Sequence, residues 1–279
     1  MTGAAWLAWR NNRQTALIGG GLAAAAAAAL VAVAVLETTE PTTSVHILIT
    51  ASRALLIAAP AVAGVFFAAP LFSSDFERGT HRLIWTQGIT RKRWAAVSLS
   101  MLMVLSALAA AARAAGGQIW IAHLPSTAGA SADATWEIYD VQAPVVFAYV
   151  LFGMALGAAA GAALRRTVPA MATTLGVFIA VRVAFATLAR PHLLPTVSSL
   201  VMGNTNWTTP NGTGFVDVTY LDSHLRPVDP LSAGPNAWVR MTYQPPGHFW
   251  PMQGIEAGIF VILAAVLVLA AFRLATRDG

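Results

Sequence analysis

Long apolar runs constrain this chain more than any other feature of its sequence. A helix that crosses a lipid bilayer needs roughly 20 predominantly apolar residues, and several segments reach that length. They are Thr15–Leu36, Ile47–Phe72, Ala95–Ala122, Pro144–Leu164, Val168–Ala189 and Gly254–Ala275. We therefore expect an all-α polytopic membrane protein, a single transmembrane domain over residues 1–279 with six transmembrane helices. The alanine-rich first run is the least hydrophobic, so a buried helix of a soluble protein is an alternative there.

The composition indicates that lipid is the main solvent of the chain. Hydrophobic residues make up 57% of it and charged residues only 10%, which is typical of integral membrane proteins. The net charge of +5 comes from basic residues that flank apolar runs, where anionic headgroups and membrane topology account for them. Membrane lipids are therefore expected partners and nucleic acid is not. The absence of cysteine excludes disulfides, thiolate metal sites and a cysteine nucleophile.

The distribution of basic residues predicts the orientation of the spans. Only Arg190, Arg226 and Arg240 fall in loops on one side of the six-span scheme. The other side carries Arg10, Arg13, Arg78, Arg82, Arg91, Lys92, Arg93, Arg165, Arg166, Arg273 and Arg277. Because basic loops remain in the cytoplasm, we expect both termini to be cytoplasmic. The alanine bias points to a bacterium, so we expect a multi-pass protein of the bacterial cytoplasmic (inner) membrane.

The longest predicted loop, residues 190–253, lies on the outer side in this scheme. It is rich in Pro, Gly, Asn and aromatic residues, and we expect it to form an extracellular cap. Within it, residues 204–222 (NTNWTTPNGTGFVDVTYLD) alternate polar and β-prone residues around turn formers, which favours a short hairpin. The aromatic residues of Tyr243–Trp250, with Trp238, are typical of a membrane-interface belt; a gate for cargo is the alternative.

A charged segment, Ser73–Trp94 (SSDFERGTHRLIWTQGITRKRW), separates the second and third runs and cannot lie in lipid. Gly79 disfavours a helix, Thr80 is a good N-cap and Gly88 is a good stop. The sequence therefore predicts a short cytoplasmic helix near His81–Gln87. A loop that only reversed the chain would need fewer residues. An ordinary basic loop is the alternative, above all for Arg91–Arg93.

The stretch FERGTHRLIWTQGITRKRW resembles the loop between the second and third spans of ABC-2-type ABC transporter permeases, where an acidic-Gly-Thr turn precedes the coupling helix that docks on the ATP-binding subunit. The patches WLAWRNNR, RRTVPAMATTLGVFIAVR, RPHLLP and YQPPGHFWPMQGIEAGIF also resemble an actinobacterial group of these permeases. The resemblance implies the ABC-2 (type V exporter-like) fold and a coupling segment at Asp75–Gln87. Its residues for coupling to the ATPase partner would be Asp75, Phe76, Glu77, Arg78, Gly79, Thr80, His81, Arg82, Leu83 and Trp85.

The same resemblance implies a function. The chain would be the permease subunit of an ATP-driven exporter, moving a hydrophobic or amphiphilic compound such as a drug, antibiotic or lipid-like molecule, as in multidrug efflux. Its partners would be an ABC ATP-binding subunit, which holds ATP and Mg, and a second permease copy, as a homodimer or heterodimer that meets mainly on the first and fifth spans. Two alternatives stay open: a non-transporting membrane anchor or immunity-type complex, and an ion-coupled secondary transporter. The secondary transporter is disfavoured because no carboxylate or histidine lies in the middle of a predicted span.

Catalytic motifs are absent from the sequence. The single lysine, Lys92, follows Arg91, so the chain has no Gly-Lys-Ser/Thr phosphate loop. It also lacks HExxH, Gly-x-Ser-x-Gly and the paired intramembrane carboxylates of an intramembrane protease. We therefore expect no enzyme, no metal site and no cofactor in this chain, with ATP hydrolysis in a separate subunit.

Three arginines fall inside predicted spans, namely Arg53, Arg113 and Arg182. Each costs about 2.5–3.5 kcal/mol at the centre of a bilayer on insertion scales. All three lie toward the outer ends of their helices, where snorkelling lowers this cost. The acidic residues Glu37, Glu137 and Glu256 lie at similar depth and can pair with them. Ion pairing or snorkelling is one hypothesis for these residues, and contact with a polar or anionic part of a cargo is the other.

Small residues form a ridge in the fourth predicted span. Gly153, Gly157 and Gly161 recur at four-residue spacing, which lets another helix approach closely. The partner can be another helix of the same chain or a second subunit. In the second span, Pro60 and Pro70 each remove a backbone donor, so we expect a kink there.

Overall fold

The computed structural model describes residues 57–79, 90–122, 139–202, 214–234 and 237–277. These residues are mostly helical and divide into two compact units. A helical unit contains the described residues up to 122, Asp140–Val183 and the chain from Glu256 onward. A second unit contains Tyr139 and Ala184–Ile255. The expectation of a mostly helical chain is confirmed, while the first predicted span lies outside the described residues.

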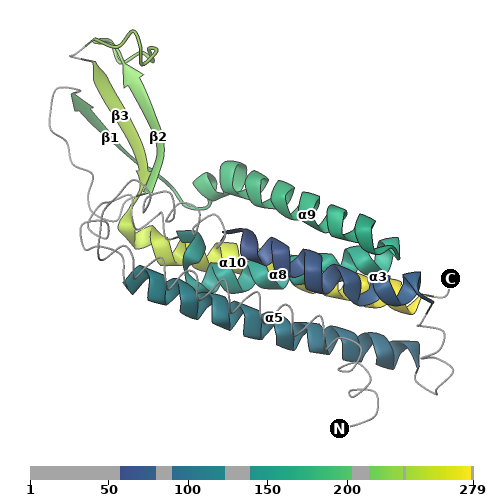
Figure 1. The fold of residues 1–279 in the computed structure, drawn as a ribbon. Helices are drawn as coiled ribbons and strands as arrows, with labels where there is room; N and C mark the ends of the chain where they lie inside the picture. Colours follow the sequence, from purple (N-terminus) through teal and green to yellow (C-terminus); the bar gives the residue numbers. More distant parts are fainter. Residues whose placement is uncertain (1–56, 80–89, 123–138, 203–213, 235–236, 278–279) are drawn as a thin grey trace, which may run out of the picture. The chain divides into compact units, whose positions relative to one another are not determined.

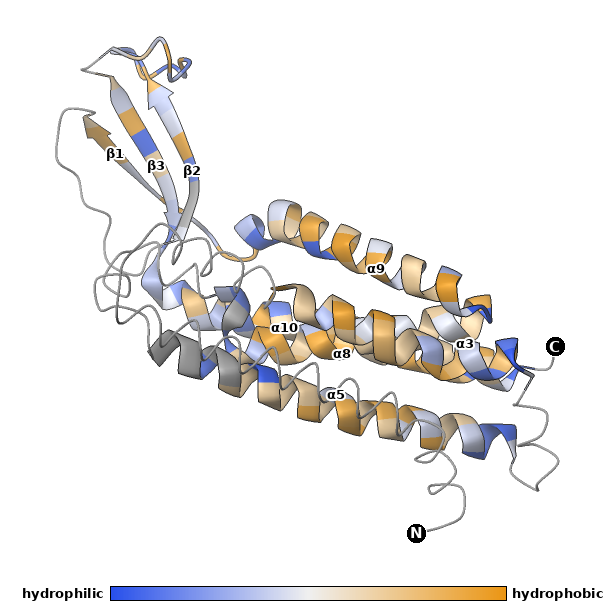
Figure 2. Cartoon of the chain, in the orientation of Figure 1, coloured by the Kyte–Doolittle hydropathy of each residue, from blue (hydrophilic) through white to orange (hydrophobic). Residues whose placement is uncertain are grey.

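Helices that are long and apolar enough to cross a membrane dominate the described part of the chain. They are Ile57–Glu77, Arg91–Ala115, Thr167–His192, Ala143–Leu164 and Pro246–Thr276. In Figure 1 they correspond to η1 (Gly64–Ala68) with α3 (Ala69–Glu77), and to α5 (Arg91–Ala122), α8 (Ala143–Leu164), α9 (Thr167–Ala184) and α10 (Phe249–Thr276). Apolar residues cover most of their length, and the N-terminal end of α5 is hydrophilic (Figure 2). The described part of the chain therefore contains five candidate membrane spans.

Helix α8 occupies the centre of the helical unit. Nearly all of it is buried, and it packs against η1, α3 and α5. The core on this helix includes Val150 and Met154, together with Phe72 of α3 and Leu102 of α5. A helix that is apolar on all sides is expected in such a central position.

The glycine ridge of α8 faces the helix that contains η1 and α3. A Cβ atom added at Gly153 would lie 2.5 Å from the carbonyl oxygen of Pro60, and one at Gly157 would lie 2.3 Å from that of Gly64. At Gly161 the corresponding contact is the Ala69 carbonyl oxygen at 2.3 Å. Only hydrogen fits at these positions, so the two backbones approach at van der Waals distance. The ridge packs within the chain.

A π-helical turn, η1, interrupts the second span between its two prolines. The Ala69 N–H donates to the Gly64 carbonyl, five residues earlier. Pro70 follows directly, and it has no N–H to offer the Phe66 carbonyl of an unbroken α-helix. The wider turn accommodates this missing donor and the proline ring.

The second span ends later than the sequence predicts. Helix α3 continues past Phe72 to Glu77, and Ser73 and Asp75 are buried. The hydroxyl of Ser73 donates to the Ala69 carbonyl at 2.8 Å, and that of Ser74 to the Pro70 carbonyl at 2.6 Å. These bonds back to the preceding turn satisfy both hydroxyls inside the helix. The helix therefore continues five residues beyond the predicted end of the span at Phe72.

The third span also begins earlier than predicted, because the basic cluster Arg91–Arg93 forms the first turn of α5. The Arg93 N–H donates to the hydroxyl oxygen of Thr90 at 3.3 Å, an N-cap contact. Trp94 is buried against the aromatic residues of α3. The predicted short helix near His81–Gln87 lies outside the described residues.

The second unit contains a three-stranded antiparallel sheet. Its strands are β1 (Val197–Met202), β2 (Gly214–Leu221) and β3 (Trp238–Gln244), in the order β1-β3-β2. Strand β2 lies within residues 204–222, for which a hairpin is predicted, and it pairs with β3. The first half of the predicted hairpin, residues 204–213, lies outside the described residues, so the hairpin stays a prediction.

Short helical turns precede and follow the strands in the sequence. Before β1 lie η3 (Phe185–Ala189) and η4 (Arg190–His192), and after β3 lies η5 (Pro246–His248). A further turn, η2 (Tyr139–Val141), precedes α8. Gln244, at the end of β3, is buried and its amide donates to the Leu194 carbonyl at 3.0 Å. Its side-chain oxygen lies 2.8 Å from the Nδ1 atom of His248. This glutamine connects the sheet with the turns on both sides of it.

Candidate functional site

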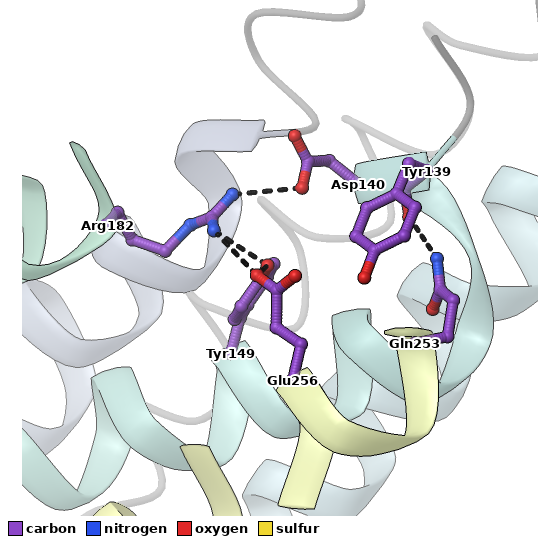
Figure 3. Close-up of polar contacts among 6 residues, drawn as sticks. All are labelled: Tyr139, Asp140, Tyr149, Arg182, Gln253 and Glu256. Atoms are coloured by element: carbon purple, nitrogen blue, oxygen red, sulfur yellow. Dashed lines mark hydrogen bonds and ion pairs between the residues drawn. The ribbon is translucent and has the colours of Figure 1, made fainter. Parts of the chain in front are cut away.

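Arg182 of α9 lies at the centre of a polar cluster in the helical unit (Figure 3). Its NH2 group lies 3.1 Å from a carboxylate oxygen of Asp140, and its NH1 group lies 3.4 Å from a carboxylate oxygen of Glu256. NH1 also donates to the hydroxyl of Tyr149 at 2.6 Å. The guanidinium carbon is 3.8 Å from the centroid of the Tyr149 ring. One guanidinium thus joins α9 to α8, to α10 and to the turn before α8.

The charged side chains of this cluster are largely shielded from water, which strengthens the interactions between them. The Glu256 side chain is fully buried, and those of Arg182 and Asp140 are only 11% and 23% exposed. The Tyr149 hydroxyl donates to the same carboxylate oxygen of Glu256 that faces Arg182. A buried carboxylate without such partners would destabilise the fold by several kcal/mol, so each donor to Glu256 is structurally important.

Helical periodicity places the cluster next to a layer of aromatic rings. Tyr149 and Phe152 are three residues apart on α8, and Glu256 and Phe260 are four apart on α10, so each pair shares a helix face. The rings of Tyr149 and Phe260 meet edge to face with centroids 4.9 Å apart, and Phe152 and Phe260 do so at 5.2 Å. The polar groups therefore border an apolar layer that excludes water from one side.

The second unit has polar contacts of its own. Gln253 is buried, and its amide donates to the Tyr139 carbonyl at 2.7 Å (Figure 3). The Arg190 guanidinium lies 4.5 Å from the centroid of the Tyr139 ring, and Phe249 meets that ring edge to face at 5.6 Å. These contacts hold the beginning of α10 and the turn at Tyr139 together.

Of the four residues predicted for cargo contact or ion pairing, the structure brings Arg182 and Glu256 together. Arg113 lies on α5, within electrostatic reach of Asp140, and Arg53 lies outside the described residues. Sequence reasoning missed two members of the cluster. Asp140 lies between two predicted spans, outside both apolar runs. Tyr149 is the only hydroxyl-bearing side chain of the run Pro144–Leu164, which is the signal that could have revealed it.

The predicted coupling residues are partly described. Asp75, Phe76 and Glu77 form the last turn of α3, Arg78 follows as its C-cap, and Gly79 has a φ of 69°. A Cβ at Gly79 would meet nothing within 4 Å, so glycine is favoured there by its left-handed backbone and not by space. The remaining predicted residues, Thr80, His81, Arg82, Leu83 and Trp85, lie outside the described residues.

The end of α3 contacts two other helices. The Phe76 ring meets the Trp94 ring of α5 edge to face, with centroids 5.9 Å apart, and the Arg165 guanidinium lies 5.0 Å from the Phe76 centroid. The carboxylate of Glu77 accepts hydrogen bonds from the N–H and the hydroxyl of Thr167, at 2.9 and 2.7 Å. Through Phe76 and Glu77, the beginning of the predicted coupling segment thus contacts α5 and the turn between α8 and α9.

Metal ligation has no support in the part of the chain that the structure describes. No group of three or more His, Asp or Glu side chains there could hold a metal ion. The buried acid Glu256 instead contacts Arg182 and Tyr149, which supports ion pairing rather than metal binding.

Comparison with protein families shows which family the chain resembles. The family described as ABC-2 membrane transporter related matches residues 1–190, which is more than half of the chain. The matched region includes α3, α5, α8 and α9 with the junction at Glu77 and the Arg182 side chain. No curated protein and no solved structure matches the chain. The resemblance to ABC-2 permeases is thus confirmed at the level of the family, and the chain is an integral membrane protein that belongs to the ABC-2 membrane transporter-related family.

Proposed function

We propose that the chain is the permease subunit of an ATP-driven ABC exporter that moves a hydrophobic or amphiphilic compound across the cytoplasmic membrane. The observation that carries the proposal is the match of residues 1–190 to the ABC-2 family. The five apolar helices of spanning length support it, with the run Thr15–Leu36 as the proposed sixth. The arginine distribution supports cytoplasmic termini.

The proposed complex contains separate ATP-binding subunits and a second permease copy. Membership of the ABC-2 family implies association with an ABC ATP-binding subunit. The sequence supports this division of labour, because its single lysine is not part of a phosphate-binding loop. The segment Asp75–Gln87 is the proposed docking element, and the glycine at 79 supports a change of chain direction at its root.

Unequal packing of α8 and α9 supports a mechanism with a fixed and a movable helix. Helix α8 is nearly all buried, whereas the buried residues of α9 are Ala170, Thr174 and Phe178. These three recur every four residues, so α9 contacts the rest of the unit along one narrow stripe. Within one subunit, a helix held in this way can move with little loss of buried area, as alternating exposure of a transport path requires.

For Arg182 we propose structural ion pairing. Three of its five N–H donors are directed at Asp140, Tyr149 and Glu256, so most of its donor capacity is used within the chain. Contact with an anionic part of a cargo remains the alternative outcome of the tests below. Arg182→Ala that leaves folded, assembled protein with an active ATPase partner but no export would favour the alternative.

One comparison tests the proposed function. The permease is purified together with the ATPase encoded beside its gene and reconstituted in vesicles, and nucleotide hydrolysis and efflux of a hydrophobic dye are measured. Hydrolysis with ATP-dependent efflux is the expected result. Stable association without any efflux would contradict it in favour of a membrane anchor. Efflux that needs only an ion gradient would contradict it in favour of a secondary transporter.

A further inference from the structure

Two segments far apart in the sequence meet where α3 ends and α9 begins. Both donors of Thr167, its N–H and its hydroxyl, are directed at one oxygen of Glu77, at 2.9 and 2.7 Å. The hydroxyl oxygen of the buried Ser73 lies 3.4 Å from that of Thr167. The last two turns of α3 therefore hold the first residue of α9.

This contact has a simple physical cause. The N–H groups in the first turn of a helix have no partner within the helix, and the helix dipole favours a negative charge there. The residues that directly precede Thr167 are Arg165 and Arg166, which cannot act as acceptors through their side chains. Glu77, the last residue of α3, supplies the acceptor instead.

The contact at this junction is directional rather than strongly stabilising. Glu77 is exposed, and exposed ion pairs and hydrogen bonds add little to the free energy of unfolding. Because Glu77 is exposed, its carboxylate can also move without disturbing the packing of the core. A role in positioning α9 therefore explains this arrangement better than a role in stability.

We infer that Glu77 is a positioning residue that transmits displacement of the end of α3 to α9, through Thr167. This inference rests on the proposed function, in which the segment after Gly79 is moved by an ATP-binding subunit. The rest of α9 is held by its narrow buried stripe and by Arg182 near its other end. Movement at Thr167 would thus tilt α9 relative to the buried helix α8.

The absence of cysteine makes the inference directly measurable. Cysteines introduced at the exposed positions Ala172 of α9 and Ser100 of α5 would be the only thiols in the permease. Nitroxide labels on this pair report the distance between the two helices by pulsed electron paramagnetic resonance. The distance is measured in the complex of permease and ATP-binding subunit, without nucleotide and with a non-hydrolysable ATP analogue. ATP hydrolysis by the same samples is recorded in parallel.

The expected result is a nucleotide-dependent shift in the labelled parent that is lost in Glu77→Ala while ATP hydrolysis remains. Glu77→Gln should restore much of the shift, because its amide oxygen still accepts the Thr167 N–H. Thr167→Val should reduce the shift, and Thr167→Ser, which keeps both donors, should preserve it. Asp217→Ala, which removes an exposed carboxylate on β2, is the control and should leave the shift unchanged.

Failure of the inference is distinguishable from failure of the proposed function. If the parent shows the shift and Glu77→Ala shows it equally, the link through Thr167 is overturned while the proposed function stands. If hydrolysis is present and the parent shows no shift, movement of α9 is overturned. If the ATP-binding subunit neither associates nor hydrolyses ATP, the proposed function fails and the inference with it.

Discussion

The hydroxyl of Tyr149 donates to the fully buried carboxylate of Glu256, and it also accepts a hydrogen bond from Arg182. A tyrosine in the N-terminal half of α8 therefore contacts both charges, the carboxylate from α10 and the guanidinium from α9. Its removal leaves the carboxylate with fewer donors in a place that water reaches poorly.

We predict that Tyr149→Phe lowers stability without a change in side-chain volume large enough to disturb packing. The loss should be about 1–3 kcal/mol, the cost of an unsatisfied buried polar group. Thermal unfolding of the detergent-purified protein measures it. Tyr220→Phe on the partly buried face of β2 is the matched control, and an equal effect of both variants would show that the Glu256 contact is unimportant.

We predict that substitutions of Arg182 and Glu256 have non-additive effects on stability, because the two side chains form an ion pair. Arg182→Ala leaves Glu256 buried without its cation, which should destabilise the protein by about 3–5 kcal/mol. Glu256→Gln in the same protein should recover part of that loss, because the neutral amide is cheaper to bury. Unfolding temperatures of the two single variants and the double variant give the coupling energy. Additive effects would argue that the two side chains act independently.

The close contact of α8 with the second span predicts an unequal response of two glycines. Gly153→Ala places a Cβ 2.5 Å from the Pro60 carbonyl oxygen, so the helices must separate at a cost of about 1–3 kcal/mol. Gly176→Ala on α9 meets nothing within 4 Å and should leave stability unchanged or raise it, since alanine is the better helix former. Unfolding in detergent by heat compares them. Similar losses at both positions would contradict the packing described for α8.

A pH-dependent turn is predicted in the second unit. The N–H groups of Arg226 and His224 donate to one carboxylate oxygen of Asp222, at 2.9 and 2.8 Å. The bond from Arg226, followed by that from His224, lowers the pKa of Asp222 from its ordinary value of 3.8. A lowered pKa means that the ionised carboxylate stabilises the turn above pH 3.8, and that this contribution is lost as the pH falls through the pKa of the folded state.

Carboxyl carbon NMR of the full chain in detergent micelles measures this pKa, with Asp222→Asn to assign the signal. The titration midpoint should lie below 3.8. A midpoint at or above 3.8 would contradict the hydrogen-bonded geometry. The Asn variant should keep the turn across this range, because its amide oxygen still accepts both N–H groups and does not titrate.

Some of these features were predictable from the sequence and others were not, for physical reasons. Helix α8 was predictable because its apolar run is bounded by Pro144 and by the pair Arg165–Arg166, which mark a start and an end. The end of α3 was not, because serine hydroxyls that bond to carbonyls of the preceding turn look like loop residues in a sequence. Strand β2 carried a recognisable pattern, but its partner β3 is remote, and local patterns do not specify pairing across such distances.

The candidate site also contains residues that were predictable from the sequence and residues that were not. Arg182 and Glu256 stood out because charges are rare in apolar runs, and their contact was a reasonable hypothesis from depth alone. Tyr149 did not stand out, since a tyrosine in a span is usually treated as apolar bulk. The contact of Glu77 with Thr167 could not be foreseen, because it depends on how the ends of two helices meet in space.

The π-helical turn at Gly64–Ala68 has a consequence for the face that α3 presents. Such a turn holds one residue more than an α-helical turn, and each residue of an α-helix advances the direction of its side chain by about 100°. The wide turn absorbs this extra residue, so deleting one residue there would restore regular hydrogen bonding and leave the later side chains directed much as they are. Deleting one residue from the regular helix between Pro70 and Glu77 would instead rotate Glu77 away from Thr167. The second span therefore tolerates a shorter chain in its wide turn but not in the regular helix beyond it.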